Sequence, residues 1–295
     1  CDRRQRQMCI RDRIETEGGV LSCRCPDGLR GEKITLSFPS VGATENILIA
    51  AASADGETVI LNAAREPEIA DLADFLCSCG AHISGAGSGE ITVCGMKKLH
   101  SAEHTVIPDR IIASTYMAAA AVTGGDIRIL DTRAEHITPV IPVFEQAGCK
   151  VDCGENSVHI SAPVRLRSVQ TVRTMPYPGF PTDSQAAVMA MLSVAHGTSV
   201  MIENIFENRY RHVRELCRLG ADIMTEGKVA VIKGVETLTG ACVCAADLRA
   251  GTALAVAGLA AQGSTTIENV CLIDRGWQDM EEKLRSLGAE IRRES

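Results

Sequence analysis

The sequence is poor in aromatic residues, and other features that would indicate a function class are missing. Phe, Trp and Tyr make up 3% of the 295 residues, so stacking of nucleic-acid bases on exposed rings has little support. The net charge of −7 also disfavours a nucleic-acid partner. Gly or a charged residue interrupts every long apolar run before about 18 residues, the length needed to span a bilayer. We therefore expect no nucleic-acid partner and no membrane partner.

Metal-binding spacings are absent, although the chain contains 13 cysteines. No cysteine pair forms a CxxC motif, and no histidine stands at zinc-finger spacing. A chain of this length does not need disulfides for stability. We expect the cysteines to be buried thiols in a reducing cytosol, which favours a cytoplasmic protein without a bound metal.

The sequence does contain an internal repeat of about 70 residues. One series of glycines closes amphipathic segments, at intervals of 68, 72 and 68 residues: Gly80, Gly148, Gly220 and Gly288. A second series closes alanine-rich segments, at intervals of 69, 72 and 66 residues: Gly56, Gly125, Gly197 and Gly263. Two markers with a shared period indicate duplicated supersecondary units.

Each unit is expected to contain two kinds of helix and several strands. The first kind is apolar on nearly all faces, as in residues 45–56, 114–125, 184–197 and 251–263, and such helices are buried. The second kind is amphipathic and ends at glycine, as in 67–81, 137–149, 211–221 and 278–289. Segments rich in β-branched residues predict strands, namely 57–63, 90–96, 126–132, 157–163, 229–235 and 265–273. The fold class is therefore α/β (or α+β), with buried helices inside and sheets outside.

The organisation of the chain is expected to be asymmetric. Residues 1–13 contain five arginines without periodicity, and we interpret them as non-native sequence. Polar residues and a proline near residues 105–109 interrupt the repeat, which predicts a domain boundary. Residues 14–107 would be the remnant of a first repeat domain, and residues 108–295 a second one.

Polar residues open the predicted buried helices, where unpaired N–H groups favour anions. Ser40, Val41 and Gly42 open the first helix and suit a diphosphate, whereas Asp247 and Arg249 open the last one. Plain capping is the alternative for Ser40 and Asp247. Arg249 is harder to explain as a cap, because a cation at a helix start opposes the helix dipole, and a bound anion would account for it.

Three further charged residues are candidates for chemistry. Asp183 follows a proline-rich turn at a helix start, where it could act as a general base toward a hydroxyl or simply cap the helix. Arg209 and Arg275 occupy matching loops and, with Arg249, could bind a phosphate and a carboxylate. A salt bridge to Asp274 is the alternative for Arg275.

Seven segments of the sequence form a recognisable set: PSVGATEN (39–46), NAAREPEI (62–69), IPDRI (107–111), PYPGFPTD (176–183), IFENRY (205–210), ADLRAG (246–251) and IDRG (273–276). Together these segments resemble one family, the UDP-N-acetylglucosamine 1-carboxyvinyltransferases, also called UDP-N-acetylglucosamine enolpyruvyl transferases. The resemblance extends from residue 14 to about residue 292.

The resemblance implies an inside-out α/β barrel in two domains. It also implies transfer of the enolpyruvyl group of phosphoenolpyruvate to the 3′-hydroxyl of UDP-N-acetylglucosamine, the first committed step of bacterial peptidoglycan synthesis. No metal or organic cofactor is expected. Asp183 would contact the sugar hydroxyl as base, and Asp247 would lie near the reacting carbon. The resemblance assigns the remaining positions to the two substrates: Arg249 and Arg275 to phosphoenolpyruvate, Arg209 to the cleft, and Pro39, Ser40, Val41, Gly42 and Ile205 to the nucleotide sugar.

Two family features have no counterpart in this sequence. They are the N-terminal Lys-Asn pair and the loop with the reactive cysteine, so we expect a fragment that is inactive alone. Two other functions remain open: 5-enolpyruvylshikimate-3-phosphate synthase, which shares the fold, and a non-catalytic sugar-nucleotide-binding paralogue. The sequence carries no signal for the oligomeric state.

Overall fold

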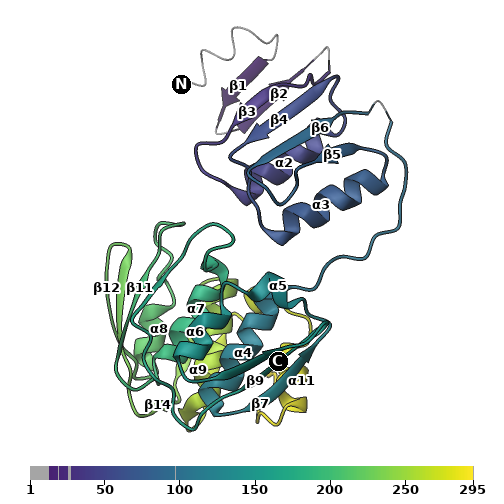
Figure 1. The fold of residues 1–295 in the computed structure, drawn as a ribbon. Helices are drawn as coiled ribbons and strands as arrows, with labels where there is room; N and C mark the ends of the chain where they lie inside the picture. Colours follow the sequence, from purple (N-terminus) through teal and green to yellow (C-terminus); the bar gives the residue numbers. More distant parts are fainter. Residues whose placement is uncertain (1–12, 19, 26–27, 97, 295) are drawn as a thin grey trace. The chain divides into compact units, whose positions relative to one another are not determined.

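The structure is a computed structural model that describes residues 13–18, 20–25, 28–96 and 98–294 (Figure 1). The chain divides into two compact units between Ile107 and Pro108. The interpretation of residues 1–13 as non-native falls, except for Arg13, outside the described residues. None of the described helices has both the length and the apolar character needed to cross a bilayer.

The first unit is built on a four-stranded sheet. Its elements are β1 (Arg13–Glu17), β2 (Val20–Arg24), β3 (Lys33–Thr35), α2 (Val41–Ala51), β4 (Glu57–Leu61), α3 (Pro67–Ser78), β5 (His82–Ser84) and β6 (Glu90–Cys94). The sheet has the order β3-β4-β6-β5, in which only β3 and β4 are parallel. Leu48, Ile60, Ile69 and Ile91 form the centre of the core between this sheet and the two helices. Strands β1 and β2 form an antiparallel hairpin.

The second unit contains four groups of paired strands around three long helices. Its elements are α4 (Arg110–Thr123), β7 (Asp126–Leu130), α5 (Ala134–Ile137), α6 (Ile141–Gln146), β8 (Lys150–Cys153), β9 (Ser157–Ser161), β10 (Thr171–Arg173), α7 (Thr182–Leu192), β11 (Thr198–Ile202), α8 (Val213–Arg218), β12 (Asp222–Glu226), β13 (Val229–Lys233), β14 (Leu238–Thr239), β15 (Cys242–Cys244), α9 (Leu248–Ala260), β16 (Ala261–Gln262), β17 (Thr266–Glu268), α10 (Cys271–Asp274) and α11 (Met280–Ser286).

The two four-stranded sheets confirm the repeat. The sheet of the second unit has the order β10-β11-β13-β12, with β10 and β11 parallel and the other pairs antiparallel. This is the topology of β3-β4-β6-β5, and a long helix connects the parallel pair in each case. A three-stranded antiparallel sheet, β7-β9-β8, and the parallel pairs β14-β16 and β15-β17 complete the second unit.

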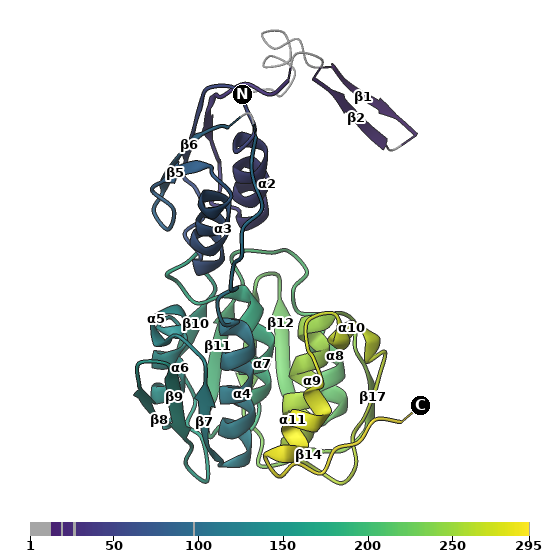
Figure 2. The same cartoon turned by 90° about the vertical axis from the view of Figure 1, so that its right-hand side faces the viewer.

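Helices α4, α7 and α9 form the interior of the second unit, with sheets on the outside (Figures 1 and 2). Every residue of α7 from Ser184 to Leu192 is buried. Alanine dominates where these helices contact one another, and small side chains let helix backbones approach closely. The predicted layer order, helices inside and sheets outside, is confirmed for this unit.

The glycines of the first series end their helices as predicted. Gly80, Gly148, Gly220 and Gly288 have φ values of 102°, 100°, 91° and 99°, the left-handed region that glycine adopts without steric cost. In the second series the prediction was wrong, because none of its glycines caps the preceding helix. The C-cap residues of α2, α4, α7 and α9 are Ala52, Gly124, Ser193 and Ala261, and of these Gly124 has the left-handed conformation, with φ 64°.

Helix α2 departs from its prediction as a buried helix. Only Thr44, Leu48 and Ala51 are buried in it, and the side chain of Ile49 is 55% exposed. The difference has a physical reason, because among the described helices of its unit α2 packs against α3 alone, whereas α4, α7 and α9 enclose one another.

Two other segments fold differently from their predictions. Residues 265–273 form a strand only over Thr266–Glu268, because Asn269 turns the chain with φ 59° and the short helix α10 follows. Residues 137–149 form the end of α5 and a separate α6. Pro142 lies in the first turn of α6, where its missing N–H costs nothing, so a new helix begins there.

Of the cysteines whose burial the structure describes, two agree with the expectation of buried thiols. Ten described cysteines are free thiols, of which Cys79 and Cys149 are buried. The exposed ones are Cys77, Cys94, Cys153, Cys217, Cys242 and Cys271. Most of the described thiols therefore face solvent, since the alternating pattern of the strands and helix ends places them on the outer surface.

A core substitution measures how much the helix packing contributes to stability. Leu254, in the middle of α9, has no exposed surface, and we expect Leu254→Ala to lower the free energy of unfolding by about 2–5 kcal/mol. Leu130→Ala, on the outer face of β7 where the side chain is 67% exposed, is the control and should cost below about 0.5 kcal/mol. Urea denaturation of both variants measures these changes. Equal decreases in the free energy of unfolding would contradict this description of the core.

Candidate functional site

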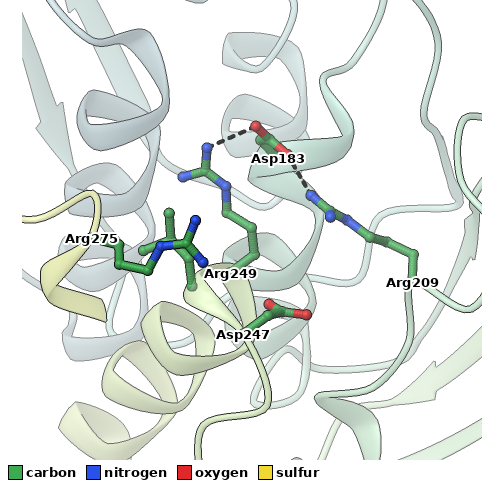
Figure 3. A pocket seen from close by; sticks show the side chains of 6 residues that line it. Asp183, Arg209, Asp247, Arg249 and Arg275 are labelled. Atoms are coloured by element: carbon green, nitrogen blue, oxygen red, sulfur yellow. Dashed lines mark hydrogen bonds and ion pairs between the residues drawn. The ribbon is translucent and has the colours of Figure 1, made fainter. Parts of the chain in front are cut away.

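A hollow of about 300 Å³ lies at the N-terminal ends of α7 and α9 (Figure 3). Its lining is charged, with three arginines, two aspartates and one leucine. These residues are Asp183, Arg209, Asp247, Leu248, Arg249 and Arg275. The structure therefore brings together five of the residues that the sequence predicted as site residues.

Asp183 lies in the first turn of α7 and is paired with two arginines. Pro181 is the N-cap residue, and Asp183 makes no capping bond. Arg249 Nη2 donates to Asp183 Oδ2 at 2.7 Å, and Arg209 Nη2 donates to Oδ1 of the same carboxylate. The capping alternative for Asp183 is wrong, because its carboxylate faces side chains of the hollow.

Asp247 combines capping with a place in the hollow. It is the N-cap residue of α9, and its Oδ1 accepts from the backbone N–H of Ala250 at 2.8 Å. The cap fixes the first turn of α9 and with it Arg249, whose guanidinium reaches back to Asp183 (Figure 3). The capping role considered for Asp247 is thus present, and it fixes the position of Arg249 in the hollow.

Arg275 reaches the hollow from the end of α10. It is the C-cap residue of that helix, and no ion pair to it occurs among the described residues. The salt bridge that we considered between Arg275 and Asp274 does not form, because Asp274 is paired with Arg293 at 2.7 Å. Gly251 makes this approach possible, since a Cβ there would lie 2.5 Å from Ile273 Cγ1.

Arg209 belongs to the loop that follows β11. Its guanidinium lies 5.2 Å from the centroid of the Phe206 ring, a cation–π arrangement that orients it toward Asp183. Ile205 lies in the same loop, half-buried, and does not line the hollow.

The other predicted binding residues lie in the first unit. Ser40 is the N-cap residue of α2, and its Oγ accepts from the N–H of Ala43 at 3.3 Å, so capping is confirmed. Pro39, Val41 and Gly42 flank this cap. Their role toward a diphosphate stays a prediction.

The arrangement of charges in the hollow suits a small anion. The three guanidinium groups are mounted on separate elements, and Arg209 and Arg249 are only about one-fifth exposed. Partly buried, fixed donors of this kind bind carboxylate and phosphate groups more strongly than donors in water.

No group of three or more His, Cys, Asp or Glu side chains in the described part of the chain is arranged to hold a metal ion.

Sequence reasoning missed two residues at this site. Leu248 forms a wall of the hollow between two charged neighbours, and no sequence signal marks an aliphatic residue for that position. His212 lies beneath the site, 2% exposed, with Nε2 3.2 Å from Met189 Sδ. Burial, together with the nearby charge of Arg209, lowers the pKa of His212 to about 4 against the opposing effect of Asp247.

His212 should make stability depend on pH. Between pH 6.5 and about 4 the unfolded chain protonates this histidine while the folded chain keeps it neutral. Lowering the pH through that window should therefore decrease the free energy of unfolding, by at most about 3 kcal/mol for this residue. Urea denaturation at several pH values, with wild type and His212→Gln, measures the effect. The variant should show a flatter profile, and parallel profiles would contradict the burial of a neutral ring.

The sequence profile of the EPSP synthase (3-phosphoshikimate 1-carboxyvinyltransferase) family matches residues 6–284. The match begins inside the segment 1–13 that we interpreted as non-native. The chain is 50% identical over 278 residues to UDP-N-acetylglucosamine 1-carboxyvinyltransferase 2 of Caldanaerobacter subterraneus subsp. tengcongensis, covering 94% of this chain and 66% of the relative. It is 49% identical to the protein of the same name from Carboxydothermus hydrogenoformans, covering 96% of this chain and 68% of that one.

Solved structures agree with the fold. The enolpyruvyl transferase NikO from Streptomyces tendae superposes with a TM-score of 0.86 at 26% identity, covering 96% of this chain and 70% of that one. EPSP synthase from Acinetobacter baumannii gives a TM-score of 0.72 at 21% identity, covering 97% and 70%, which supports the fold alone. The chain spans about two thirds of the length of the curated relatives that it matches.

Proposed function

Because this chain belongs to the EPSP synthase family and, within it, to the UDP-N-acetylglucosamine 1-carboxyvinyltransferases, we propose that the full-length gene product carries out enolpyruvyl transfer. The substrates would be phosphoenolpyruvate and UDP-N-acetylglucosamine, and phosphate would be released. The reaction would take place in the cytoplasm as the first committed step of peptidoglycan synthesis. The single observation that carries the proposal is the hollow in which three arginines and two carboxylates meet.

The chemistry requires two anions to be held beside a reacting carbon. Phosphoenolpyruvate has a phosphate and a carboxylate, and Arg249 and Arg275 would bind them through fixed guanidinium donors. Arg209 would support Arg249 from the other side of Asp183. Positive charge that develops on the enol carbon would be stabilised by Asp247, whose position is fixed by its cap to α9.

Asp183 would act on the acceptor sugar. A new bond forms between the 3′-oxygen and the enol carbon, the bond from that carbon to the phosphate oxygen breaks, and the hydroxyl proton must leave. Asp183 would accept this proton. Support comes from its place in the first turn of α7, where its side chain is 37% exposed and faces the hollow. The two arginines hold the carboxylate in position.

The nucleotide part would be bound by the segment Pro39–Gly42 and by the backbone at Ile205. Support for the first segment is the capped start of α2, whose remaining N–H groups suit a diphosphate. No organic or metal cofactor enters this proposal. Synthesis of 5-enolpyruvylshikimate 3-phosphate is the weaker alternative, since relatives at 48–50% identity carry the other name.

A binding experiment on the full-length gene product distinguishes the two acceptors. Isothermal titration calorimetry with UDP-N-acetylglucosamine should give a saturable heat, and shikimate 3-phosphate should give none. Enolpyruvyl transfer is then tested by measuring the release of inorganic phosphate from phosphoenolpyruvate in the presence of each acceptor. Heat and phosphate release with shikimate 3-phosphate alone would overturn the proposal, and binding of the nucleotide sugar without turnover would indicate a non-catalytic paralogue.

A further inference from the structure

Glu203 is a buried carboxylate that the proposed chemistry does not use. It follows β11, and its side chain is 1% exposed. The carboxylate accepts four hydrogen bonds. Oε1 accepts from Thr174 Oγ1 at 2.8 Å, from Ile205 N at 2.8 Å and from Phe206 N at 3.0 Å, and Oε2 accepts from Thr182 Oγ1 at 2.9 Å.

All four donors are neutral, and no ion pair to Glu203 occurs in the described part of the chain. A buried carboxylate is costly unless its oxygens are saturated with hydrogen bonds. An apolar residue would fill the same space at lower cost, as replacements of buried charges often show. Glu203 therefore needs an explanation beyond packing, and the identity of its partners supplies one.

The donors to Glu203 come from three segments that meet at the site. Thr182 immediately precedes Asp183 at the start of α7. Ile205 and Phe206 begin the loop that carries Arg209. One carboxylate thus anchors both partners of the Asp183–Arg209 ion pair.

The anchor is itself held in place from the outside. The backbone N–H of Glu203 donates to the Lys228 carbonyl at 2.8 Å. Thr174, which has no exposed surface, donates to the carboxylate and accepts from the Asn204 N–H at 2.9 Å. Glu203 therefore links the sheet that contains β11 to the loop that carries Arg209 and to the start of α7.

We propose that Glu203 is a positioning residue that sets the distance between the Asp183 carboxylate and the Arg209 guanidinium. The expected effect of Glu203 on kcat rests on the proposed function, because the aligned pair is useful only if Asp183 acts on a substrate hydroxyl. The alignment of Asp183 and Arg209 by Glu203 does not depend on that function, since it can be measured without turnover.

The test compares Glu203→Gln with Glu203→Ala in the full-length gene product. Glutamine keeps a carbonyl oxygen for Thr174 and the two N–H groups, and its amide can donate to Thr182 Oγ1, so kcat should stay within about 3-fold of wild type. Alanine removes all four bonds, and kcat should fall by about 10- to 100-fold with little change in the KM for UDP-N-acetylglucosamine. A direct acid–base role would instead make glutamine as harmful as alanine.

A second measurement does not depend on turnover. The Arg209 Nε–H resonance, assigned by substitution, should move in Glu203→Ala and stay near its wild-type position in Glu203→Gln. If both variants keep the resonance and kcat, the proposal is overturned. If wild type shows no transfer at all, the proposed function fails, while the resonance still decides whether Glu203 aligns Arg209.

A third pair of variants covers the case in which Glu203→Ala does not fold. Thr182→Val removes only the link from Glu203 to α7 and has nearly the same shape as threonine, whereas Thr182→Ser keeps the hydroxyl. The Arg209 resonance should move in the valine variant and not in the serine variant. An unmoved resonance in both variants would overturn the proposal.

Discussion

Asp183→Asn should lower kcat for enolpyruvyl transfer by about 10²- to 10⁴-fold, the range expected when a general base is removed. Asparagine has the size of aspartate and keeps an acceptor oxygen for one of the two arginines, but its NH2 group cannot accept from the other arginine and it cannot take the hydroxyl proton. The affinity for UDP-N-acetylglucosamine should change by less than about 3-fold, since one hydrogen bond to the sugar contributes little net free energy.

The measurement is phosphate release at saturating substrates, together with calorimetric titration of the nucleotide sugar. Thermal unfolding of the variant controls for damage to the start of α7. Asp152→Asn, at an exposed carboxylate on β8 outside the hollow, is the matched control and should leave kcat unchanged. Turnover at the wild-type rate in Asp183→Asn would refute the role of this aspartate as base.

Arg249→Gln should have the second largest effect, a loss of about 10²- to 10³-fold in kcat/KM for phosphoenolpyruvate, as for removal of one fixed donor to a developing anion. The guanidinium of Arg249 is only one-fifth exposed and is mounted on the capped first turn of α9. Glutamine keeps much of the side-chain volume but loses the charge and the two-pronged donor geometry.

Initial rates over a range of phosphoenolpyruvate concentrations measure this loss. Arg128→Gln, on the outer sheet that contains β7, is the control for the removal of one positive charge. An increase in KM for the nucleotide sugar alone would contradict the assignment of Arg249 to phosphoenolpyruvate. Arg249→Lys should recover only part of the loss, because an ammonium lacks the planar fork.

The repeat and the position of the site residues could be predicted because they depend on local signals. Glycines in the left-handed conformation, alanine-rich segments and helix-opening aspartates leave clear marks in the sequence. These marks identified α4, α7 and α9, and the residues at the starts of α7 and α9 do meet in one hollow.

The features that the sequence did not predict depend on contacts between segments that are distant in sequence. Strands β14 and β16 have two residues each, too few to show an alternating pattern. The exposure of Ile49 follows from the number of neighbours of α2, which no property of that segment reveals. Glu203 looks like an ordinary polar residue after a strand, and its four hydrogen bonds are visible only in the folded chain.

The thiols on the outer surface have a consequence for chemical labelling of this protein. Among the residues that the structure describes, an alkylating reagent would meet six exposed cysteines, none of which lines the hollow. Their rates would also differ, because partial burial and the neighbouring Glu145 raise the pKa of Cys153, which lowers its thiolate fraction. Covalent modification should therefore be located by peptide mapping, since the mass gain of the intact chain would report on surface chemistry and not on catalysis.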